Sequence, residues 1–226
     1  MSAEPRASLI VPLMKARVPA EVQLEFPLPP DEEPIRDPFA GDLYVTYALE
    51  LVPEPVGAGL LPGSGVAAAR PGVPGAGRRY EHIARRHCAG LGVAPAELRR
   101  LAVANLRNRR PDLTLSWYPD VRAVTVSLGE GLESGLLLDD GFLDKLAQDV
   151  EGDLVVAAPA RDVFAATGTG HPDGVEKLRW AVDQVWSEGE AAEDADPAWD
   201  VPAGALLTRD LLVRRAGAWE TLATAT

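Results

Sequence analysis

Alternating hydrophobic and polar positions predict β-strands in several parts of the chain. The clearest run is residues 42–52, DLYVTYALELV, in which every second side chain is large and apolar. Two further alternating runs, 113–118 and 121–128, are separated by a Pro-Asp pair. Such runs on either side of a tight turn are typical of a β-hairpin with one buried face.

Shorter apolar segments are also expected to be strands. Residues 8–14 should form a strand at a sheet edge, since Pro12 has no amide proton to donate to a central ladder. Residues 154–158 form a continuous apolar run, LVVAA, which is typical of a strand buried on both faces. The remaining expectations are a strand at 136–138 and a hairpin formed by 211–215 and 218–222.

Helical periodicity predicts four helices between these strands. Residues 78–91 and 95–109 follow one another, and the second opens on a proline, which suits a first helical turn. A short helix begins at Asp139 or Asp140, either of which can accept hydrogen bonds from free amides of the first turn. The most regular amphipathic pattern lies at 175–186 and predicts the last helix.

The order of these elements predicts the fold class. Strands come in adjacent pairs with helices in blocks between them, which favours a single α+β domain, a mostly antiparallel sheet with helices packed on it. Residues 1–52 should form an extended N-terminal segment of this domain, and residues 78–226 its α+β core. Between them, 12 of the 25 residues at 53–77 are Pro or Gly, which predicts a flexible linker. Residues 188–200 are acidic and should form an exposed loop.

Charge and composition narrow the class of function. With a net charge of −12, the chain is not expected to bind nucleic acid, because phosphate contacts need clustered cations. A basic protein partner would instead be attracted to it. Cys88 is the only cysteine, so neither an intrachain disulfide nor a thiolate metal cluster can form. No run is long and apolar enough for a signal peptide or a membrane span, so we expect a cytoplasmic protein without membrane contact. The oligomeric state stays open.

Three segments carry a family resemblance: AVANL at 102–106, SGLLLDDGFLD at 134–144 and GDLVVAAPARD at 152–162. In this order, around the predicted hairpin, they resemble the YtpQ-like bacterial proteins, which are known mainly as a domain of unknown function. The resemblance covers about residues 78–186. It implies a single α+β domain of the cytoplasm, and it implies no catalytic residue.

Familiar catalytic and metal motifs are absent from the sequence. His82, His87 and Cys88 fall in the predicted helix 78–91, where a spacing of five points the two histidines in different directions. No G-x-S-x-G nucleophile motif occurs. His171 precedes a Pro-Asp pair and is expected at the start of a helix. We therefore expect no metal and no cofactor, and a binding protein more than an enzyme.

Charged residues beside the buried strands are the remaining candidates for a site. Asp139, Asp140 and Asp144 could hold a divalent cation through their oxygens, but a helix cap with acidic residues in the first turn explains them as well. Arg161 and Asp162 follow the most apolar strand, where an Arg can hold a carboxylate in a bidentate pair. A structural ion pair that fixes the turn is the competing interpretation. If a ligand site exists, Arg161 and Asp162 should lie at its centre. Its expected neighbours are Asp139, Asp140 and His171.

Three functions stay open on the sequence alone. The first, preferred because no catalytic motif occurs, is a protein that binds another protein as an adaptor or an immunity-type protein, with a basic partner favoured. The second is a small-molecule or divalent-metal-dependent enzyme, or a ligand-binding domain, that uses Arg161 and the nearby aspartates. The third is a structural scaffold.

Overall fold

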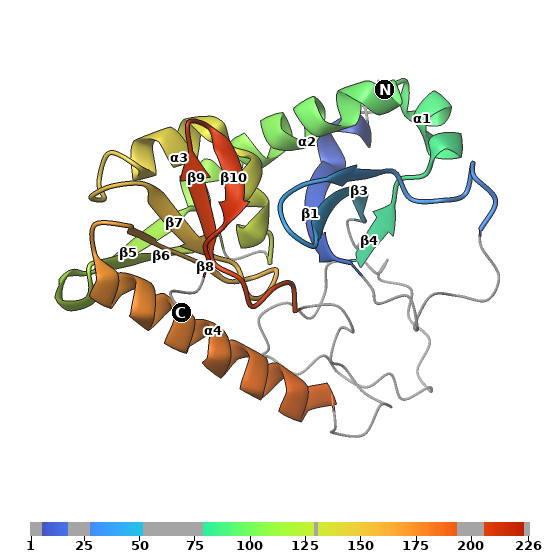
Figure 1. Cartoon of the computed structure of the whole chain (residues 1–226). Coiled ribbons are helices and arrows are strands. Elements are labelled where there is room, and N and C mark those ends of the chain that lie inside the picture. Colours follow the sequence, from blue (N-terminus) through green and yellow to red (C-terminus); the bar gives the residue numbers. More distant parts are fainter. Residues whose placement is uncertain (1–5, 18–27, 52–78, 129–130, 194–205, 224–226) are drawn as a thin grey trace, which may run out of the picture.

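Two antiparallel sheets and the helices packed on them form the protein, as a computed structural model shows (Figure 1). The structure describes residues 6–17, 28–51, 79–128, 131–193 and 206–223. Within these ranges every strand pair is antiparallel and helix is abundant, so the predicted α+β class is confirmed. The predicted linker at 53–77 lies outside the described residues.

A four-stranded sheet contains most of the N-terminal part. Its strands are β1 (Ile10–Ala16), β2 (Arg36–Pro38), β3 (Leu43–Leu51) and β4 (Arg79–His82). β3 lies at the centre, with β1 on one side and both β2 and β4 along the other. β1 is an edge strand, as the proline at its third position predicts. β3 is buried along most of its length, so the sheet is covered on both faces there.

A six-stranded sheet contains most of the C-terminal part. Its strands are β5 (Thr114–Tyr118), β6 (Ala123–Ser127), β7 (Leu154–Ala157), β8 (Phe164–Gly168), β9 (Leu212–Arg215) and β10 (Ala218–Thr221). They lie in the order β10-β9-β7-β8-β6-β5, so β5 and β10 are the two edges. The two predicted hairpins, β5–β6 and β9–β10, are confirmed. β7 lies inside the sheet, as its continuous apolar run predicts.

Helices cover both sheets. The α-helices of the described residues are α1 (Arg85–Leu91), α2 (Leu98–Arg107), α3 (Asp140–Leu146) and α4 (Pro172–Glu193). Short 3-10 helices are η1 (Arg6–Leu9), η3 (Pro95–Glu97), η4 (Arg110–Asp112), η5 (Pro119–Val121) and η6 (Glu133–Leu138). α2 packs on β1, and α4 runs along β7 and β8 (Figure 1). Within the described ranges, no helix has the length and apolar character that crossing a bilayer requires.

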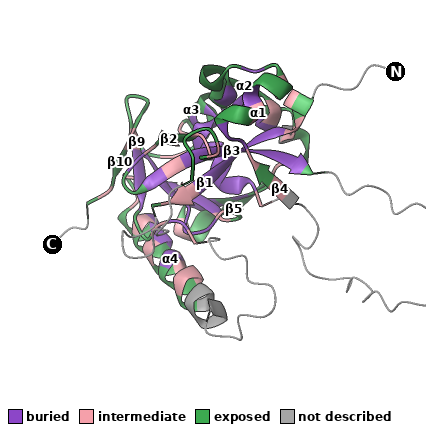
Figure 2. Cartoon of the chain, turned by 90° about the vertical axis from the view of Figure 1, so that its right-hand side faces the viewer, coloured by how far each residue is buried: buried purple, intermediate pink, exposed green. Residues whose placement is uncertain are grey.

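Two hydrophobic clusters hold these layers together. Leu154 and Val156 of β7 face the larger cluster, which is continuous with α2, η6 and the four-stranded sheet. Val155 faces the smaller one on the opposite side, where Leu178 and Val182 of α4 pack. Each such aliphatic side chain stabilises the fold by about 1.5–3 kcal/mol. Figure 2 shows the buried residues concentrated in the strands, with exposed residues along the outer side of α4.

Three local predictions are wrong. Residues 79–82, expected in a helix, form strand β4, because pairing with the edge of β3 overrides a weak helical pattern. His82 therefore lies on a strand and not on one helix with His87. Residues 136–138, expected as a strand, belong to η6, whose six residues are all buried. The acidic loop expected from 188 begins as the last turns of α4.

Candidate functional site

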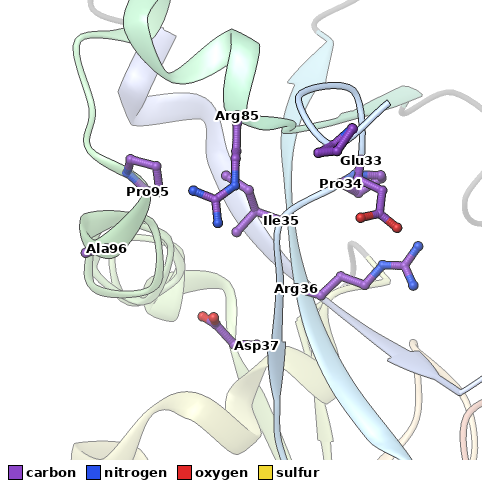
Figure 3. Close-up of a pocket in the computed structure, with 9 residues that line it drawn as sticks. Glu33, Pro34, Ile35, Arg36, Asp37, Arg85, Pro95 and Ala96 are labelled. Carbon is purple, nitrogen blue, oxygen red and sulfur yellow. The ribbon is translucent and has the colours of Figure 1, made fainter. Parts of the chain in front are cut away.

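A polar hollow of about 380 Å³ lies between the four-stranded sheet and the helices that precede α2 (Figure 3). It is lined by residues between 30 and 37, by Arg85 of α1 and by residues 95–96. Figure 3 shows the Arg85 guanidinium in this hollow and Arg36 pointing away from Asp37. Arg36 and Asp37 are consecutive residues of β2, so they face opposite sides of the sheet.

The carboxylate of Asp37 is held by a buried phenol. Tyr47 of β3, which is fully buried, donates its hydroxyl proton to Oδ2 of Asp37. Burial and the bound carboxylate raise the pKa of the Tyr47 phenol far above its ordinary value. A phenol held protonated in this way donates hydrogen bonds and does not act as a base or a nucleophile. The pair that Asp37, which lines the hollow, forms with Tyr47 is therefore structural.

Asp139 is the most buried of the residues that the sequence proposes for a site. Its carboxylate accepts a hydrogen bond from the Phe142 amide at 3.3 Å and pairs with Nε of Arg107 at 3.0 Å. It thus caps the start of α3 and ties α3 to α2. The helix-cap interpretation is confirmed. Asp139 lies in the interior, away from any surface open to a ligand.

Asp140 has a different partner. Its Oδ1 lies 3.1 Å from Nη2 of Arg214 on β9, and Nη1 of Arg214 lies 2.6 Å from Oδ1 of Asp144. Asp139 and Asp140 therefore diverge, because consecutive positions at a helix start face different sides. In the part of the chain that the structure describes, no three His, Cys, Asp or Glu side chains are placed to hold a metal ion.

His171 lies just before α4, as its Pro-Asp successor predicts. Its Nδ1 is 3.2 Å from Nη1 of Arg122, and its Nε2 is 3.7 Å from Oε2 of Glu151. It lines a hollow of about 250 Å³ beside β5, together with Trp117 and Tyr118. These hydrogen-bond and ion-pair contacts do not include the other four proposed site residues.

Arg161 and Asp162 occupy the turn between β7 and β8. The carbonyl of Arg161 accepts a hydrogen bond from the Ser134 amide of η6 at 3.0 Å, so the backbone fixes this turn. Nε of Arg161 is buried without a hydrogen-bond partner, whereas Asp162 is exposed. Among the described residues neither side chain forms an ion pair. The described residues therefore give no support to the competing interpretation, a structural ion pair that fixes the turn.

An exposed apolar strand is the feature that sequence reasoning missed. β5 carries three of the six exposed large hydrophobic side chains of the described residues: Leu115 at 44%, Trp117 at 43% and Tyr118 at 49%. The alternation at 113–118 predicts one buried face, yet all five residues of β5 are exposed. The available signal was the adjacent Trp and Tyr, because neighbours on a strand face opposite sides and only one side could be buried.

Comparisons with known proteins give one distant relative. No protein-family model matches the chain, and no solved structure matches it. Over 121 residues the chain is 28% identical to UPF0354 protein BH3252 of Halalkalibacterium halodurans. The aligned part makes up 54% of this chain and 46% of that protein, so the chain spans about half the length of its relative. This relative comes from an uncharacterised bacterial family. The similarity agrees with the sequence analysis in that both lead to bacterial proteins of unknown function.

Proposed function

We propose that this protein binds an extended, basic segment of another protein along strand β5. The observation that carries the proposal is an edge strand whose five side chains are all exposed, Leu115, Trp117 and Tyr118 among them. The outer edge of such a strand offers unpaired amide and carbonyl groups, to which an extended chain can add a further strand. Exposed aromatic side chains supply the contacts that dominate many protein interfaces.

The side chains around β5 suit an incoming strand. Leu115 and Trp117 lie on one face of β5 and Tyr118 on the other, because side chains alternate along a strand. Trp117 and Tyr118 also line the hollow of about 250 Å³ that reaches His171 and Arg122. The edge of β5 would pair with the backbone of the bound segment, and the hollow would receive one of its side chains. Backbone pairing supplies affinity in this mode of binding, and the hollow supplies specificity.

Acidic residues around β5 favour a basic partner. Asp112 precedes the strand, Asp120 follows it and Asp149 lines the hollow, and all three are exposed. The whole chain carries a charge of −12, which attracts a basic protein over long range and repels a second copy of itself. More specifically, we propose an adaptor or immunity-type role for this protein.

We also propose that the relatives of the chain are the YtpQ-like proteins. This proposal is supported by the three segments at 102–106, 134–144 and 152–162 that carry the resemblance.

Quantitative affinity capture with the full chain tests the role of β5. Trp117→Ser removes the central aromatic side chain, and we expect the affinity for the captured partner to fall about 30-fold, which corresponds to about 2 kcal/mol. Leu115→Ser should weaken capture less than tenfold, by roughly 1 kcal/mol or less. Leu51→Ser is the matched control, since Leu51 is 41% exposed but lies at the end of β3.

The outcomes separate this proposal from its competitors. Capture should weaken with rising salt, because screening reduces attraction between the acidic chain and a basic partner. The proposal fails if the captured proteins are the same for wild-type and Trp117→Ser chains, or if no partner is captured at low salt. A dimer in light scattering that Trp117→Ser dissolves would assign β5 to self-association and overturn the basic partner.

A further inference from the structure

Basic side chains gather on one face of the four-stranded sheet. Arg36 of β2 lies directly opposite Thr46 of the central strand β3. Lys15 of β1 lies opposite Tyr44, two residues before Thr46. His82 of β4 lies opposite Ala48, two residues after Thr46. Directly opposed residues of antiparallel strands share a face, and so do residues two apart on one strand. Lys15, Arg36 and His82 therefore project from the same face.

Neutral neighbours orient two of these basic groups. The buried hydroxyl of Thr46 lies 3.4 Å from Nδ1 of His82. The guanidinium of Arg36 lies 5.4 Å from the centre of the Tyr44 ring, in a cation–π contact. Both contacts fix the direction of the side chain, and neither supplies a negative charge. Lys15 and His82 are half-buried, and Arg36 is exposed, so this face stays open to solvent at one side.

Arg161 adds a fourth basic group from the β7–β8 turn. The backbone of that turn is bonded to η6, and η6 packs against β1. Burial lowers the pKa of both Lys15 and His82, and the charge of Arg161 lowers both further. Arg161 therefore interacts electrostatically with both side chains. Its buried Nε has no hydrogen-bond partner.

None of these four basic groups has an acidic partner among the residues that the structure describes. Glu50, which lies on the same face, is paired with Arg109. Like charges gathered at a half-buried surface repel one another, and burial weakens their screening by water. In a chain with a net charge of −12 this arrangement stands out. Ionisable groups whose pKa is perturbed cluster at functional sites.

We propose that this face binds the phosphoryl group of a small molecule, with Arg161 and Lys15 contacting its oxygens and His82 beside them. A dianionic group matches several converging cations, whereas a single carboxylate would balance only one of them. The planar fork of Arg161 can engage two oxygens at once, and Lys15 acts as a point charge. Thr46 is a positioning residue, because its hydroxyl holds the ring of His82.

Thermal unfolding and calorimetry of the full chain test this site with inorganic phosphate as the probe. Phosphate should raise the melting temperature, and chloride at equal ionic strength should not. Arg161→Gln keeps the backbone carbonyl that fixes the turn and should weaken phosphate binding at least tenfold, as should Lys15→Gln. Arg100→Gln is the matched control, since Arg100 is an exposed cation of α2, and it should bind phosphate like the wild type.

Stability without ligand separates a binding role from a structural one. In phosphate-free buffer, Arg161→Gln should melt at the wild-type temperature or above it, because the substitution relieves repulsion. A lower melting temperature with unchanged phosphate affinity would make Arg161 structural and overturn the site. Equal shifts with phosphate and chloride would also overturn it. Stronger binding of citrate than of phosphate would overturn the phosphoryl assignment. Tighter binding of a phosphoserine peptide than of free phosphoserine would overturn the small-molecule assignment.

Discussion

Two partly buried arginines of this molecule have opposite surroundings. Arg214 of β9 is 10% exposed and lies between the carboxylates of Asp140 and Asp144. The charge of Arg161 acts on Lys15, and Arg161 has no acidic partner among the described residues. The fold alone accounts for the charge of Arg214, because two carboxylates pair with its guanidinium. Its Nε is buried without a hydrogen-bond partner, as is that of Arg161, so the two arginines differ in their charge partners alone. The fold does not account for the charge of Arg161, and an unbalanced charge of this kind is a functional candidate for a stated physical reason.

The region around α3, where carboxylates pair with Arg107 and Arg214, should lose the most stability when the buried carboxylate of Asp139 is removed. Asp139→Ala deletes the cap of α3 and the partner of Arg107, and we expect the free energy of unfolding to fall by about 2–3 kcal/mol. Arg107 is 49% exposed, so its charge can turn to water and the loss stays below that of a fully buried pair. Urea denaturation measures the change.

Asp140→Ala is the control for that substitution. Asp140 is largely exposed, so losing its pair with Arg214 should lower the free energy of unfolding by less than about 1 kcal/mol. Equal losses for Asp139→Ala and Asp140→Ala would mean that surface charge, and not the buried cap, holds this region together.

Matched substitutions of the two arginines test the contrast directly. Arg214→Met removes two ion pairs with exposed carboxylates and should lower the free energy of unfolding by about 1 kcal/mol. Arg161→Met removes one of several like charges and should leave stability unchanged or raise it slightly. Urea midpoints in phosphate-free buffer compare the two variants. A similar loss in both would show that Arg161 is as firmly paired as Arg214, which would end the distinction.

The hydrophobic pattern within a segment correctly predicted the helices and strands that this pattern alone is enough to specify. β3, the two hairpins, β7, α2 and α4 each carry a period that buries one face or both, and each is present. β4 was missed because it exists through pairing with a strand far away in the sequence. Residues 136–138 were predicted as a strand because a short apolar run suits a buried helical turn equally well.

The sequence pointed to one residue of the candidate site, Arg161, and did not predict the residues around it. Arg161 was expected at the centre of this site, and its side chain forms no ion pair with the described residues. The expected aspartates cap and brace α3 instead, and the charge of Arg161 acts on Lys15 and His82 of the other sheet. Register between distant strands decides which side chains meet, and one sequence does not specify it. That Arg161 contacts a ligand stays a prediction.

The smallest expected effect is a pH dependence from His82. Burial lowers the pKa of His82, and the charges of Lys15, Arg161 and Arg36 lower it further. The unfolded chain has the ordinary histidine pKa of about 6.5, so it binds a proton at pH values where the folded protein does not. Acid therefore favours unfolding. The stability that neutral His82 contributes is complete above about pH 6.5 and is lost as the pH falls toward the folded pKa.

His82→Gln should remove this part of the pH dependence and keep a side chain that can bond to Thr46. We expect the urea midpoint to fall less between about pH 7.5 and about pH 5.5 in the variant than in the wild type. Arg161→Gln should reduce the same fall, because its charge contributes to the lowered pKa of His82. Equal falls in all three proteins would mean that His82 does not sense the neighbouring cations. The contrast between Arg161 and Arg214 would then rest on the missing acidic partner alone.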